Sequence, residues 1–254
     1  MHIQALARLF ALFCFILLLI GRGKGLRSIA ALLLSAVIIS KGIIPLITHG
    51  FNPILVALLG GVLIITTIVY LTEGFNIKGT LAVASVIACS LITLGLAWLF
   101  IGWTHLNGLT SEIEASISVY GTHRINLPEL LLAGMIIGTL GILSETVISQ
   151  ISAVEGMYTI NRSLPWHHVY RQAHAIGIAH LTSIINTLFL IYASVTLPLL
   201  IVFIGNHSTL SDIFNTDVVA TEVVRTLTGA IGVALSIPLA TFLASWWLRP
   251  RNKQ

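Results

Sequence analysis

The sequence has very few charged residues for its length. Only 9% of its 254 residues are Asp, Glu, Lys or Arg, whereas a typical soluble domain carries about 25%. Hydrophobic residues make up 56% of the chain, and the mean hydropathy is +0.99. A soluble fold could not cover this much apolar surface, because too few polar residues remain. The composition therefore excludes a soluble domain and favours an integral membrane protein.

Other scarce features narrow the class further. The two cysteines, Cys14 and Cys89, lie inside apolar runs, so no disulfide framework is expected. Strand-like alternation is absent, which excludes a membrane barrel. The net charge is +4, but the basic residues lie in short loops and form no basic domain, so nucleic-acid binding is excluded. No small-residue cleavage site follows the first apolar run, which indicates a retained helix.

Long hydrophobic runs are what the sequence does contain. A run of about 20 apolar residues crosses a bilayer as a helix. The sequence therefore predicts one all-α transmembrane domain over residues 1–254 with about seven helices. The expected spans are residues 5–20, 26–47, 53–71, 80–103, 128–154, 176–204 and 221–248. The sixth contains Pro198, so it is either one kinked helix or a helix followed by a short interfacial piece.

Basic residues in the loops indicate the orientation, because cytoplasmic loops carry an excess of Lys and Arg. The alternation of spans places nine of the thirteen basic residues on one side of the membrane: Arg22, Lys24, Arg27, Lys78, Arg162, Arg171, Arg249, Arg251 and Lys253. We therefore expect a multi-pass plasma-membrane protein with its N-terminus outside and its C-terminus in the cytoplasm. Between the fifth and sixth spans, Trp166 and Tyr170 predict an amphipathic segment at the inner interface.

The fifth span carries an ionisable residue where lipid would be expected. Small and polar residues recur at steps of three and four and share one helix face: Gly134, Gly138, Gly141, Glu145, Ser149 and Ser152. Ser144 and Gln150 lie beside this stripe. A carboxyl inside a span is a functional candidate by default, because it can take up and release a proton or bind a cation.

The last two spans carry similar stripes. In the sixth, His180, Ser183 and Thr187 share a face with Asn186 beside it. The seventh has Glu222, Arg225, Gly229, Gly232 and Ser236 at the same spacing. Glycines at this spacing let helices approach closely, so we expect these three helices to pack on one another. The first three spans would then supply more of the lipid-facing shell, and Glu222 and Arg225 would form an interfacial ion pair.

Four segments carry a resemblance to a known family. Residues 138–154, 177–193, 197–200 and 222–232 resemble the signature segments of the YibE/F-like family of bacterial membrane proteins, and this chain is similar to its shorter, YibF-like members. Many relatives have paired aspartates where this chain has Ser144 and Glu145, and an aspartate where it has Ala179. The resemblance implies association with a longer YibE-like paralogue, or self-association, in lipid.

A more distant resemblance concerns mechanism. The order of an acidic helix, an inner amphipathic segment and a helix rich in Ser, Thr and Asn is similar to the membrane half of SecF and other RND-type proteins. Spans two to seven would correspond to that unit. In those proteins the acidic helix carries proton coupling, which would place the same role on Glu145.

Three functions follow from these patterns. The first is a subunit of a proton- or cation-coupled transport complex, with candidate residues Glu145, Ser144, Ser149, Gln150, His180, Ser183, Asn186 and Thr187. The second is a non-transporting assembly or biogenesis factor, whose polar stripes serve packing with a partner. The third, an intramembrane enzyme, is disfavoured because neither a His-Glu-x-x-His nor a Gly-x-Ser-x-Gly motif occurs.

No cofactor or metal is expected. The loop over residues 104–127 contains four side chains of the types that bind metals: His105, Glu112, Glu114 and His123. Their spacing matches no metal motif, and solvated loop residues are the simpler interpretation.

Overall fold

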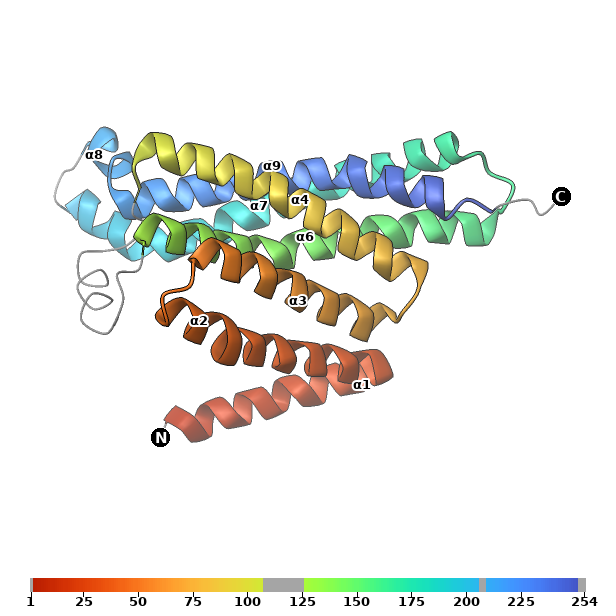
Figure 1. Cartoon of the computed structure of the whole chain (residues 1–254), viewed down its shortest axis with the longest axis horizontal. Helices are drawn as coiled ribbons and strands as arrows, with labels where there is room; N and C mark the ends of the chain where they lie inside the picture. The colour runs from red at the N-terminus through yellow and green to blue at the C-terminus, as the bar shows by residue number, and fades with distance from the viewer. Residues whose placement is uncertain (1, 107–125, 206–208, 251–254) are drawn as a thin grey trace.

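The computed structural model describes residues 2–106, 126–205 and 209–250, and every regular element in them is a helix (Figure 1). The elements in chain order are α1 (His2–Val37), the π-helix η1 (Ile38–Ile43), α2 (Ile44–Thr48), α3 (Pro53–Glu73), α4 (Ile77–Thr104), α6 (Leu127–Ile160), α7 (Trp166–Gly205), α8 (Leu210–Phe214) and α9 (Asp217–Trp247).

Six helical runs in the described residues are long and apolar enough to cross a membrane. The chain is therefore a multi-pass membrane protein. The predicted spans 53–71, 80–103, 128–154 and 221–248 correspond to α3, α4, α6 and α9. Three of these helices begin at an asparagine cap: Asn52, Asn76 and Asn126 each accept a hydrogen bond from a backbone N–H of the first turn.

The first two predicted spans form a single helical run, Ile3–Thr48, which is why six such runs are found where we expected seven spans. The run is broken at Arg22, whose torsions (φ 47°, ψ −126°) are not helical. Figure 1 shows that the segments before and after this break run side by side in opposite directions. A Cβ at Gly25 would lie 2.2 Å from the carbonyl oxygen of Leu17, so glycine is needed where the chain turns back.

The sixth predicted span and the segment before it also differ from the expectation. We expected a separate amphipathic segment ahead of residues 176–204, but α7 runs without a break from Trp166 to Gly205. Residues 166–175 form its first turns, and Pro198 lies inside it. Of the two alternatives for this region, the structure therefore has the single helix.

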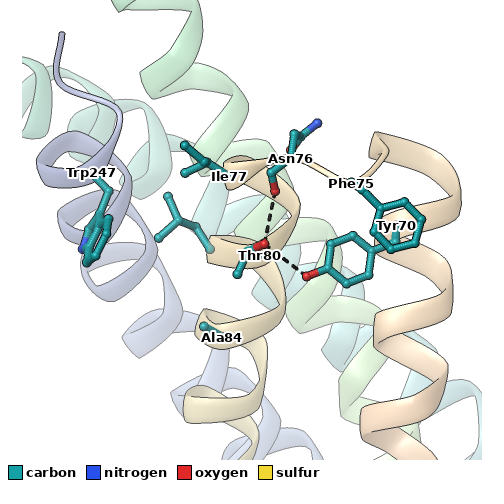
Figure 2. A pocket seen from close by; sticks show the side chains of 8 residues that line it. Tyr70, Phe75, Asn76, Ile77, Thr80, Ala84 and Trp247 are labelled. Carbon is teal, nitrogen blue, oxygen red and sulfur yellow. Dashed lines mark hydrogen bonds between the residues drawn. The ribbon is translucent and has the colours of Figure 1, made fainter. Parts of the chain in front are cut away.

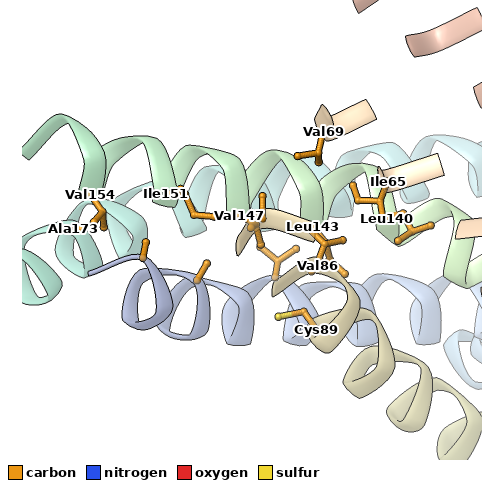
Figure 3. Close-up of a cluster of buried hydrophobic side chains, with 14 of the residues drawn as sticks. Ile65, Val69, Val86, Cys89, Leu140, Leu143, Val147, Ile151, Val154 and Ala173 are labelled. Atoms are coloured by element: carbon orange, nitrogen blue, oxygen red, sulfur yellow. The ribbon is translucent and has the colours of Figure 1, made fainter. Parts of the chain in front are cut away.

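Helix α6 lies at the centre of the bundle. Its buried residues Leu140, Leu143 and Val147 join a cluster that includes Ile65 and Val86 from α3 and α4 (Figure 3). The N-terminal run contributes least, because none of its most apolar window is buried. The expectation that the first three spans supply more of the lipid-facing shell thus fits the N-terminal run, whereas seven residues of α3 are buried.

The two ends of the bundle differ in charge. Figure 1 shows the reversal within α1, the α3–α4 connection, the α6–α7 connection and the end of α9 at the same end of the bundle. These are the segments that carry the basic residues predicted to be cytoplasmic. Lys78, at the start of α4, pairs with Glu155 near the end of α6, which ties two of these segments together.

Candidate functional site

Glu145 lies on the outer surface of α6. Its side chain is exposed, and among the described residues it forms no ion pair. It stands 18 residues after the first residue of α6 and 15 before the last, which is more than roughly 20 Å from either end at 1.5 Å per residue. The carboxyl therefore lies at mid-helix on a face that no other described helix of this chain covers.

The glycines of the same stripe are also open. Gly134, Gly138 and Gly141 are exposed. A Cβ at Gly134 or Gly141 would meet nothing within 4 Å, and one at Gly138 would come only within 4.0 Å of the Tyr192 hydroxyl. Glycines at this spacing were expected to let another helix approach closely, and among the described residues no helix of this chain occupies that space.

The polar row of α7 likewise points away from the core. His180, Ser183, Asn186 and Thr187 are all exposed. The opposite side of α7 packs inward, through residues such as Leu188 and Ala173. The three helices do pack on one another, as expected, but α6 and α7 do so through other residues than these stripes. Their apolar rows face the core because this chain's other helices offer mainly apolar side chains there.

Two of the other candidates are buried and bonded. The Ser144 hydroxyl donates to the carbonyl of Gly141 at 2.7 Å. The side-chain oxygen of Gln150, Oε1, accepts a hydrogen bond from the Thr241 hydroxyl at 2.9 Å. A Cβ at Gly177 would lie 2.7 Å from the Gln150 amide nitrogen, so α6, α7 and α9 meet closely there. This arrangement explains Ser144 and Gln150 as structural contacts, while Ser149 is half-buried one turn from Glu145.

The stripe of α9 does face the core. Gly229 and Gly232 are buried, and a Cβ at Gly232 would lie 2.1 Å from the Thr93 hydroxyl of α4. Glu222 and Arg225 form the ion pair expected from their spacing, with an oxygen–nitrogen separation of 3.6 Å. This stripe therefore packs on α4 and α6, where Gly232 meets Thr93 and Gly229 lies near Thr139.

Two pockets lie away from Glu145. One, of about 610 Å³, opens beside the α3–α4 connection, where the hydroxyls of Tyr70 and Thr80 are 3.1 Å apart and Trp247 lies across from them (Figure 2). Another, of about 520 Å³, lies between α7, α8 and α9 and includes Glu222 in its lining. Neither pocket is lined by Glu145 or by the polar row of α7.

The metal-binding alternative concerned the loop before α6. His105 is exposed at the end of α4, whereas Glu112, Glu114 and His123 lie outside the described residues. In the part of the chain that is described, no group of three or more His, Cys, Asp or Glu side chains is placed to hold a metal ion.

Comparison with protein families agrees with the segments singled out in the sequence. Residues 9–250 match the family model described as YibE/F-like protein. The chain belongs to the YibE/F-like family. The match spans all the long helices, so the exposed face of α6 and α7 is part of a YibE/F-like domain. Comparisons with curated proteins and with solved structures found no match, and the resemblance to SecF stays a prediction.

Proposed function

We propose that this YibE/F-like protein is a subunit of a proton- or cation-coupled membrane transport complex in which Glu145 is the coupling carboxylate. One observation carries the proposal: Glu145 is exposed at the middle of a membrane-length helix. A charged residue at the centre of a membrane helix costs about 3 kcal/mol on insertion scales. A residue placed at this cost is most simply explained by a function that uses its charge.

The carboxyl of Glu145 has the chemistry needed to couple transport to a proton or cation. A protonated carboxyl is neutral and tolerates apolar surroundings, whereas the carboxylate needs a cation or hydrogen-bond donors. Ser149 lies one turn from Glu145 and can supply such a donor. Exposed side chains of α7 can supply others: His180, Ser183, Asn186 and Thr187. Loss and uptake of a proton at Glu145 would therefore change which contacts this face favours, which is the basis of coupling.

The proposal includes a topology. The reversal at Arg22 divides the first helical run into two segments, giving seven crossings with the N-terminus outside the plasma membrane. Basic segments gathered at one end of the bundle support a cytoplasmic C-terminus. Trp166 and Tyr170, in the first turns of α7, would then lie at the inner interface.

A non-transporting assembly factor is the second candidate. The open glycines of α6 favour it, since they would allow a partner helix to approach whether or not ions move. Either function requires a partner in the membrane, which would be a longer YibE-like paralogue or a second copy of this chain.

Ion flux into proteoliposomes distinguishes the two. The protein, with any partner that copurifies, is reconstituted with a pH-sensitive dye inside, and proton and cation gradients are imposed. We expect Glu145→Gln to reduce flux to that of empty liposomes at an unchanged yield of folded protein. Glu129→Gln, which neutralises a carboxylate at the start of α6, serves as the control and should retain flux. Full flux in Glu145→Gln would refute the coupling role, and a stable complex without any flux would favour the assembly factor.

A further inference from the structure

The exposed rows of α6 and α7 together form a face that lipid does not suit. We call it the polar face, and define it as Gly134, Gly138, Gly141, Glu145 and Ser152 of α6 with His180, Ser183 and Thr187 of α7 and Asn186 beside them, all of them exposed. The two rows belong to neighbouring helices, because Gln150 contacts Gly177 and Tyr192 approaches Gly138. Polar side chains at membrane depth face protein or water.

Among the described residues, two glycines of this face, Gly134 and Gly141, have open space beside them. Where glycine is needed internally, a Cβ would collide: at Gly232 with Thr93 and at Gly177 with Gln150. At Gly134 and Gly141 a Cβ would meet nothing within 4 Å. Small residues in membrane helices allow the backbone of another helix to approach closely. The open glycines therefore indicate a helix supplied by a separate polypeptide.

The polar rows of α6 and α7 lie at the same depth in the membrane. Helices α6 and α7 are antiparallel (Figure 1), and the contact between Gln150 and Gly177 fixes their register. Counting equally along both helices from that contact places Glu145 level with Thr182, and Gly141 level with Asn186. The carboxyl of α6 and the hydroxyl-bearing and imidazole side chains of α7 thus occupy the same depth.

We propose that the polar face binds a second copy of this chain, related by a two-fold axis along the membrane normal. Such an axis keeps every residue at its depth, and in a two-fold interface α6 of each copy can face α7 of the other. Glu145 of one copy would then meet the Ser183 hydroxyl and His180 of its partner. The face is complementary to itself in this arrangement, with an acceptor opposite donors and open glycines beside them.

This inference deepens the proposed function by naming the partner at the Glu145 face, and it rests on that function only for the role of the carboxyl. Cross-linking between two tagged copies tests it. Cys14 and Cys89 are first replaced by alanine. One copy then carries Gly141→Cys and the other Asn186→Cys with a different tag, so that a mixed-tag product can form only between chains.

We expect this pair to form a mixed-tag dimer in native membranes under mild oxidation. The control pair places Leu91→Cys on both copies, since Leu91 is exposed at a similar distance from the same end of the bundle but lies on α4. It should form at least about tenfold less dimer. Equal cross-linking of the two pairs, or cross-linking of residue 141 only to another protein such as a paralogous subunit, would overturn the inference.

A second variant tests the close approach. Gly141→Leu should be tolerated within one chain, because a Cβ there meets nothing, but it blocks a facing helix. We expect at least about a tenfold loss of dimer, measured by subunit counting in single liposomes, which corresponds to about 1.4 kcal/mol of association free energy. An unchanged dimer would overturn the inference. Dimers without ion flux would refute the proposed transport function but support the interface. Ion flux from monomers would support the transport function but refute the interface.

Discussion

Glycine has two opposite roles in this protein, and single residues show which role applies. Gly232 and Gly177 are buried where α9 and α7 cross other helices, and a side chain at either would collide. Gly134 and Gly141 lie on the surface with open space beside them. The first pair stabilises the fold of the chain itself, and the second leaves room for a neighbour.

Gly232→Ala should destabilise the fold. Its Cβ would lie 2.1 Å from the Thr93 hydroxyl and 3.3 Å from the Thr93 Cβ, and overpacking of this kind costs about 1–3 kcal/mol. Thermal unfolding of the purified protein in detergent measures the effect. Gly134→Ala, at an open position, is the matched control and should be close to neutral.

The collision can also be relieved. Thr93→Ala removes the hydroxyl that the new methyl group would meet, so the double variant Gly232→Ala, Thr93→Ala should recover part of the stability that Gly232→Ala loses. If the two substitutions are simply additive, or Gly134→Ala is as harmful as Gly232→Ala, this contact between α4 and α9 is misassigned.

At the scale of elements, helix ends are fixed by contacts that reach across the bundle. The last four carbonyls of a helix have no partner within it. In α9 one of these, at Ser245, accepts a hydrogen bond from the buried Tyr158 hydroxyl at 2.7 Å. A side chain of α6 thus completes the C-terminal end of α9.

Tyr158→Phe should loosen the end of α9. Loss of this hydrogen bond costs about 1 kcal/mol or somewhat more, because it leaves a buried carbonyl unpaired. Hydrogen exchange should therefore accelerate in the last turn of α9 and not in its middle. Tyr70→Phe removes a hydroxyl bonded at the exposed Thr80 and should leave this exchange unchanged. Equal acceleration along all of α9 would contradict a local role for Tyr158.

The reversal in α1 is the second device at this scale. Gly25→Leu should open it, because any side chain there would meet the Leu17 carbonyl. Leu9 and Leu33 each lie eight residues from the close approach of Gly25 to Leu17, so spin labels there should report a short distance in the parent protein and a longer, broader distribution in Gly25→Leu. Gly23→Leu is the control, since nothing lies near a Cβ at Gly23. The same short distance in both variants would argue against a reversal that depends on Gly25.

At the scale of the whole molecule, the sequence predicts helices better than it predicts neighbours. Apolar length alone placed α3, α4 and α6 to within a few residues at most ends, and the Asn caps seen in the structure mark where these helices begin. The sequence could not show which side of each helix faces the core. A row of small and polar residues has the same spacing whether it contacts another part of the chain or another chain. In the structure, Gly232 lies in the core, whereas Gly141 lies on the surface.

Contacts between distant residues were missed for a related reason. The meeting of Gln150, Gly177 and Thr241, and the ion pair of Lys78 with Glu155, depend on how helices are arranged, and that arrangement leaves no mark on the spacing within any one helix. The resemblance to a family, by contrast, was recognisable from sequence segments alone, and the match over residues 9–250 confirms it.

Orientation is a property of the whole chain and has its own prediction. A reporter fused after Gln254 should be active only in the cytoplasm, because the basic segments lie at the end of the bundle where α9 stops. A cysteine at Asn52, at the opposite end, should react with impermeant reagents added outside the cell. A reporter found outside would reverse the topology.

The central claim is that Glu145 is a carboxyl within the membrane that takes up and releases a proton. Dicyclohexylcarbodiimide tests it without knowledge of the substrate, since this reagent modifies protonated carboxyls in apolar surroundings. After treatment of native membranes, mass spectrometry should find the adduct on Glu145, decreasing as the pH is raised, and not on Glu129 or Glu155. If Glu145 stays unmodified across the pH range, or is modified no more than Glu129, the account is contradicted.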